Sequence, residues 1–139
     1  MGVDELRATL ASHHLLLLDT MVFSYHLGGH PRYSPLTREI LTAVESGRNA
    51  GLTTTITLSE LLTRPAQAND LRAMQEYELY VTRFPNLRLV ALDTLLARET
   101  ARIRATTGLR TPDAVQIAAA QVYHADAVVT NDHRWQNQT

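Results

Sequence analysis

The chain has 139 residues and a mass of 15.5 kDa, which is the size of one domain and too short for a two-domain enzyme. Hydrophobic residues make up 45% and charged residues 19%, so the chain can build a core and does not have the composition of a disordered protein. Thirteen cationic and 14 acidic residues give a net charge of -1, which excludes the global positive field of a non-specific nucleic-acid-binding protein.

Two residue types are absent from the sequence. All cations are Arg and none is Lys, which excludes P-loop and Schiff-base chemistry, and the lack of Cys excludes disulfides, thiolate zinc sites and cysteine nucleophiles. The apolar run Leu15 to Leu18 is far too short to span a bilayer, and the residues before it do not resemble a secretory signal. We therefore expect a cytoplasmic protein that makes no contact with membranes.

Short apolar or β-branched runs alternate along the chain with segments whose apolar residues recur at helical spacing. Strands are expected at 15–18, 52–57, 87–92 and 125–130, and helices at 35–47, from 58 onward, and at 71–84, 93–107 and 112–123. Gly47 and Gly108 are expected to end helices, and Pro65 to break or kink the helix that starts at 58. The stretch between Asp19 and Pro35 is interpreted as polar and turn-rich.

The last of these helices has the most specific start signal. Thr111 is expected to be its N-cap and Pro112 its first helical residue. Strands that alternate with helices in this way predict βαβ units with right-handed crossovers. The fold class is therefore α/β, with a central parallel sheet of four to five strands covered by helices on both faces.

Four acidic residues follow strands or open helices, where they would face the carboxyl edge of such a sheet. They are Asp19, Glu60, Asp113 and Asp132. Four carboxylates that converge without a counter-charge repel one another, so their convergence would be costly unless a cation is bound. Ligands that contain only oxygen donors suit Mg²⁺ or Mn²⁺, which can activate a water and stabilise a phosphoryl group under attack.

Each acidic residue also has a plainer explanation, because Asp and Glu are common as helix caps and in turns. For Glu60, Asp113 or Asp132 alone, that explanation is the better one. Asp19 is harder to explain in this way, since it ends a strand of four leucines and its carboxylate must find a partner once it is buried.

Four motifs together resemble the PIN domain family, and most of all its VapC-like toxins. They are Leu17-Leu18-Asp19-Thr20, Ser59-Glu60-Leu61, Thr111-Pro112-Asp113-Ala114 and Val129-Thr130-Asn131-Asp132. The similarity extends from about His14 to His133, with the acidic positions in the family's order. It implies a single PIN domain over residues 1–139, with a three-layer α/β/α fold, that acts as a metal-dependent endoribonuclease on single-stranded RNA.

The same resemblance implies roles for individual residues. Asp19, Glu60, Asp113 and Asp132 match the family's catalytic acidic quartet and would bind Mg²⁺ or Mn²⁺. Thr20, Thr130 and Asn131 would orient those carboxylates, although capping and turn formation explain them about as well. The family also implies an RNA substrate, a cognate antitoxin and a homodimer. Members of the family typically continue past the last acidic motif into a final edge strand. This sequence stops at Thr139, so that C-terminal edge strand is expected to be absent here.

Other features receive plainer interpretations. The six histidines are expected in surface or packing positions, with only His133 close enough to the last motif to touch substrate. Arg98, Arg102, Arg104 and Arg110 lie near the Asp113 motif and could contact phosphates or simply form a solvated helix face. The alternative function is a non-catalytic PIN-like module that binds RNA or protein.

Overall fold

The computed structural model describes residues 2–27 and 34–130, which form seven helices and four strands. The strands are β1 (Leu15–Leu18), β2 (Ala50–Thr54), β3 (Leu87–Val90) and β4 (Ala127–Val129). The helices are α1 (Val3–Ala11), α2 (Thr20–Leu27), α3 (Ser34–Glu45), α4 (Thr55–Gln67), α5 (Leu71–Thr82), α6 (Thr94–Thr107) and α7 (Thr111–Val122). Within this described part, no helix is long and apolar enough to cross a membrane.

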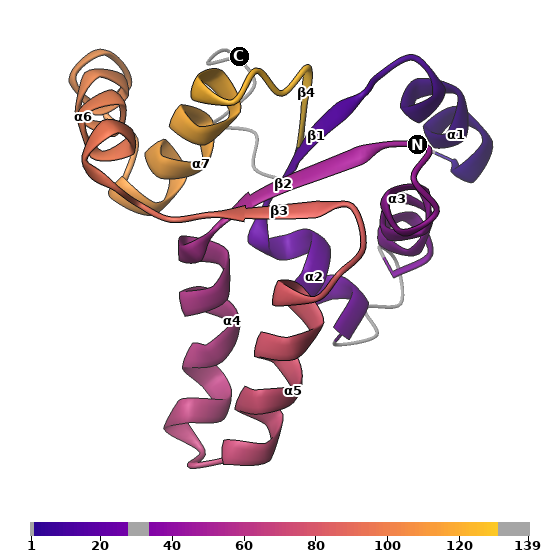
Figure 1. The fold of residues 1–139 in the computed structure, drawn as a ribbon, viewed down its shortest axis with the longest axis horizontal. Helices are drawn as coiled ribbons and strands as arrows, with labels where there is room; N and C mark the ends of the chain where they lie inside the picture. The colour runs from indigo at the N-terminus through magenta and orange to yellow at the C-terminus, as the bar shows by residue number, and fades with distance from the viewer. Residues whose placement is uncertain (1, 28–33, 131–139) are drawn as a thin grey trace.

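The four strands form one parallel sheet in the order β3-β2-β1-β4. Helices α6 and α7 lie on one side of the sheet, and α1 and α3 lie on the other (Figure 1). The predicted α/β fold with a central parallel sheet is confirmed. The predicted absence of a further edge strand concerns residues 131–139, which lie outside the described residues.

The four leucines of β1 explain why this strand reads as a continuous apolar run. Because side chains alternate across a strand, Leu16 and Leu18 enter the core formed with α1, α2 and α3. Leu17 enters the opposite core, formed with α6 and α7. All three are at most 1% exposed, so both faces of this strand are buried.

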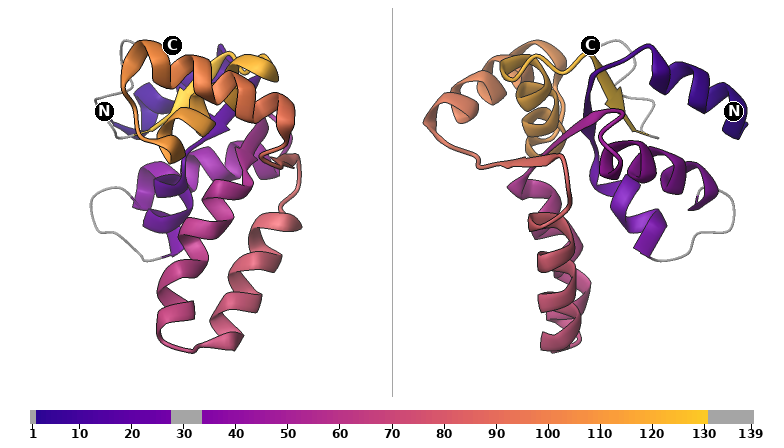
Figure 2. Two further views of the ribbon diagram at one scale, coloured as in Figure 1. Left: turned by 90° about the vertical axis from the view of Figure 1, so that its left-hand side faces the viewer. Right: turned by 45° about the vertical axis from the view of Figure 1, so that its right-hand side comes forward.

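Helices α4 and α5 form a hairpin that extends away from the sheet (Figures 1 and 2). Val81 at the end of α5 and the following Phe84 are buried in the core, as their helical spacing indicates. Leu71 and Leu79 on the same helix are 71% and 46% exposed, so the apolar residues of this segment do not all belong to the core.

Caps fix several of the helix ends, and the predicted end at Gly108 is confirmed. Asp70 accepts a hydrogen bond from the Ala73 amide, and Asp93 accepts one from the Leu96 amide, as expected of N-caps. Gly108 ends α6 with a φ of 71°, a left-handed conformation that favours glycine.

Other predictions of local structure are wrong. Helices α1 and α2 are not among the predicted elements. The strand expected at 52–57 ends at Thr54, because the Thr54 hydroxyl accepts a hydrogen bond from the Ile56 amide and caps α4. Of the predicted break or kink at Pro65, the break does not occur, since α4 continues to Gln67. The N-cap of α7 is Arg110 rather than Thr111, with no side-chain capping bond, so Thr111 is the first helical residue.

Asp126 joins the start of β1 to the turn before β4. Its carboxylate accepts both the His14 and the Leu15 amides at 2.9 Å. Burial raises the pKa of Asp126, but these backbone bonds outweigh that effect and hold the pKa below its ordinary value.

We expect Asp126→Asn to lower the free energy of unfolding by about 1 kcal/mol, since an amide oxygen cannot replace both charged acceptors. Urea denaturation at pH 7 measures this effect, with Asp4→Asn as the control because the Asp4 side chain is fully exposed. Equal stability of the two variants would contradict the prediction.

Candidate functional site

The strand order reverses direction beside β1, since the chain moves from β1 out to β3 and then returns to place β4 on the other side of β1. In open parallel sheets, ligands bind at such a switch point, beyond the carboxyl ends of the strands. Asp19 follows β1 and Thr130 follows β4 at this position. The Asp19 amide donates to the Val129 carbonyl at 3.2 Å, which extends the pairing of the two strands to their ends.

The Asp19 side chain is buried, with the residue only 7% exposed. One carboxylate oxygen accepts the Thr20 amide at 2.8 Å, and the other accepts the Thr130 hydroxyl at 3.0 Å. Within residues 2–27 and 34–130, no Arg or His forms an ion pair with Asp19. In the described part of the chain, the donors that hold the carboxylate are therefore neutral.

The pKa of Asp19 is raised to about 6. Burial is the largest cause, and the nearby negative charges of Glu60 and Asp113 add to it, while the hydrogen bonds from Thr20 and Thr130 oppose it. Three carboxylates from three separate elements thus interact electrostatically at the switch point.

Glu60 lies on α4 and is exposed. Its carboxylate accepts the Thr20 hydroxyl at 2.6 Å, and Thr20 is the first residue of α2. The backbone of Thr20 therefore contacts Asp19 while its side chain contacts Glu60, so this one residue links two of the predicted acidic positions.

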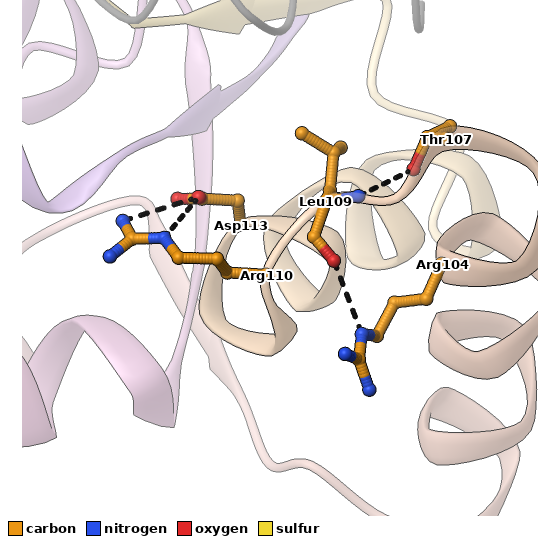
Figure 3. Close-up of polar contacts among 5 residues, drawn as sticks. All are labelled: Arg104, Thr107, Leu109, Arg110 and Asp113. Carbon is orange, nitrogen blue, oxygen red and sulfur yellow. Dashed lines mark hydrogen bonds and ion pairs between the residues drawn. The ribbon is translucent and has the colours of Figure 1, made fainter.

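Asp113 lies in the first turn of α7, with its side chain 13% exposed. The Arg110 guanidinium folds back toward it, with Nε and Nη2 both 3.4 Å from one carboxylate oxygen (Figure 3). Arg104 braces the preceding turn by donating from Nε to the Leu109 carbonyl at 3.1 Å. Among the four arginines predicted near this motif, Arg110 pairs with Asp113 and Arg102 pairs with Glu99.

The donor set of this site suits a hard divalent cation. Asp19 is a buried carboxylate with no counter-charge among the described residues, and the carboxylates of Glu60 and Asp113 raise its pKa, so a cation bound there would relieve both burial and repulsion. Within residues 2–27 and 34–130, however, no three His, Cys, Asp or Glu side chains converge closely enough to hold one metal ion. The predicted fourth carboxylate, Asp132, and its neighbour Asn131 lie outside the described residues.

A groove of about 780 Å³ opens beside Glu60, between α2, α4 and α5. Thr20 and Glu60 belong to its lining, as do Arg64, one turn further along α4, and Tyr77 of α5. The groove therefore connects the acidic site with a cation and an aromatic ring.

Sequence reasoning missed a layer of buried polar side chains beneath the carboxylates. It consists of Thr53, Thr54, Thr57 and Gln116, each at most 1% exposed. The β-branched run 53–57 was interpreted only as a strand, whereas its hydroxyls were the available signal, since buried hydroxyls require partners.

A parallel α/β fold with an acidic switch point defines the class of this protein. A family model described as PIN domain matches residues 16–139, and the chain belongs to this family. No relative was found among curated proteins.

The fold is similar to those of several solved structures. One is VapBC2 from Rickettsia felis bound to a DNA fragment from the VapBC2 promoter. It matches this chain with a TM-score of 0.68 at 15% identity, and the match covers 88% of this chain and 91% of that chain. DNA-bound VapBC from Salmonella typhimurium has a TM-score of 0.67 at 21% identity, with 89% and 92% covered. A toxin-antitoxin complex from Klebsiella pneumoniae has a TM-score of 0.64 at 17% identity, with 88% and 91% covered.

Proposed function

We propose that this protein is a metal-dependent endoribonuclease that cleaves single-stranded RNA and is the toxin of a toxin–antitoxin pair. The observation that carries the proposal is the buried Asp19 carboxylate at the switch point, within electrostatic reach of Glu60 and Asp113. Such an arrangement is costly in the absence of a cation and useful in its presence.

Asp19, Glu60 and Asp113, together with Asp132, would hold Mg²⁺ or Mn²⁺. When bound, the metal supplies a water activated for attack on a phosphodiester and stabilises the charge that develops on its oxygens. Thr130 orients the Asp19 carboxylate through its hydroxyl, and Thr20 orients Glu60 in the same way. No residue needs to form a covalent intermediate.

The groove beside Glu60 supports an RNA substrate, since a strand that reaches the carboxylates could continue along it. Arg64 could contact a phosphate there, and the Tyr77 ring offers a surface on which a base can stack. Single strands expose the base faces that such stacking requires, whereas duplexes do not.

The structural neighbours support the remainder of the proposal. They include two VapBC structures and a toxin-antitoxin complex. We propose by similarity that a cognate antitoxin binds this chain and blocks the acidic site, and that the chain forms a homodimer.

Cleavage of a labelled, unstructured RNA tests the activity directly. We expect fragments in the presence of Mn²⁺ or Mg²⁺, none in EDTA, and restored cleavage when excess metal is added back, because carboxylates alone cannot activate the water. Intact RNA under conditions in which a control PIN nuclease cuts would refute the nuclease and favour a non-catalytic RNA- or protein-binding module.

A further inference from the structure

The buried polar layer beneath the carboxylates forms one hydrogen-bonded network. Gln116 is its centre: its Nε2 donates to the Thr57 hydroxyl at 2.8 Å, and its Oε1 accepts the Thr54 hydroxyl at 2.8 Å. Thr57 is 2.8 Å from Thr53, whose hydroxyl donates to the Leu18 carbonyl at 2.8 Å. The network therefore crosses from α7 through α4 and β2 to the end of β1.

The direction of the network follows from counting protons. The Thr53 hydroxyl has one proton, and the Leu18 carbonyl can only accept, so Thr57 must donate to Thr53. The Thr57 oxygen is then free to accept from the Gln116 amide. This order requires a donor at position 116 and a hydroxyl at position 57.

Three members of the network lie close in sequence to the carboxylates. Gln116 is three residues after Asp113 on α7, and Thr57 is three residues before Glu60 on α4, so each pair shares a helix face. Leu18 directly precedes Asp19. Thr57 is also 3.3 Å from the hydroxyl of Thr20, the residue that holds Glu60.

An apolar layer could hold the same helices together, but it would not fix their rotation as directional bonds do. Buried hydrogen bonds are strong in a low dielectric and costly to leave unpaired, so a fully paired network favours a single arrangement. We propose that Gln116 and Thr57 are positioning residues that set the mutual placement of Asp19, Glu60 and Asp113 for metal binding. This inference rests on the proposed function.

Isosteric substitutions in the whole chain test the proposal. Gln116→Met and Thr57→Val remove the polar groups at nearly constant volume, and Thr57→Ser keeps the hydroxyl. Thr100→Val is the matched control, since Thr100 is 5% exposed and donates to the Leu96 carbonyl at 2.7 Å on α6, outside the network. Circular dichroism shows which variants fold, calorimetry with Mn²⁺ alone gives the metal Kd, and RNA cleavage gives kcat and KM.

We expect Gln116→Met and Thr57→Val to weaken the Mn²⁺ Kd about 10-fold and to lower kcat by a similar factor with KM little changed. Thr57→Ser should stay close to wild type, and Thr100→Val should lose stability without a change in Kd or kcat. If Gln116→Met does not fold, the comparison of Thr57→Val with Thr57→Ser tests the positioning role.

Two results would overturn the inference in different ways. A wild-type protein that binds Mn²⁺ and cuts RNA, with folded Gln116→Met and Thr57→Val variants that match it, refutes the positioning role alone. A wild-type protein that neither binds Mn²⁺ nor cuts RNA refutes the proposed function and the positioning role together.

Discussion

Asp113→Asn is expected to lower RNA cleavage about 100-fold or more, because it removes one of the charged oxygen donors proposed to bind the metal. The shape of the side chain is nearly unchanged. The variant also loses the ion pair with Arg110, but that arginine side chain is 68% exposed, and exposed pairs contribute only about 0–1 kcal/mol to stability. Cleavage rates at saturating Mn²⁺ measure the effect.

Asp93→Asn is the matched control for this substitution. Asp93 caps α6 through its carboxylate, and Asn is an equally good N-cap, so both stability and cleavage should remain close to wild type. Asp113→Asn with cleavage within about twofold of wild type would remove this carboxylate from the proposed mechanism.

Asp19 should make the stability of the metal-free protein depend on pH. Its pKa is about 6 in the folded chain, against an ordinary value of 3.8, so the folded state binds more protons than the unfolded state between these values. Stability therefore falls as the pH rises through this window. A pKa shift of this size lowers the free energy of unfolding by about 3 kcal/mol, and the loss is complete above pH 6.

Asp19→Asn should remove this contribution. In EDTA, we expect the stability of the variant relative to wild type to rise by about 2–3 kcal/mol between pH 4 and pH 7.5, measured by urea denaturation. Added Mn²⁺ should then stabilise wild type more than the variant. Asp4→Asn, at a fully exposed position, is the control. A stability difference independent of pH would show that the Asp19 carboxylate is not buried as described.

Much of the fold could be predicted because local chemistry and tertiary packing agree. The leucine run of β1 requires burial on both faces, which only a covered sheet provides. Asp70, Asp93 and Gly108 end or begin helices through bonds and angles that depend on neighbouring backbone alone. Such features can be read from a few consecutive residues.

Helix α2 and the start of α4 were missed because distant contacts decide them. Val22 and Phe23 of α2 are buried in the core, but this short helix has no regular polar face from which the sequence could predict it. Residues 53–57, four threonines and Ile56, have the β-branched side chains of a strand, yet the chain turns into α4 at Thr55. The hydroxyls of Thr53 and Thr57 have partners on β1 and α7, which are remote in sequence.

The parallel α/β class and the positions of Asp19 after a strand and of Asp113 at a helix start could be predicted from the sequence alone, whereas Glu60, expected near the start of its helix, is the sixth residue of α4. That these carboxylates share one edge of the sheet depends on the tertiary structure, since residues 41 and 53 positions apart meet only through the strand order β3-β2-β1-β4. The raised pKa of Asp19 and the network around Gln116 likewise depend on burial by elements remote in sequence. Desolvation and hydrogen-bond pairing arise from what surrounds a group, and a linear pattern does not contain those surroundings.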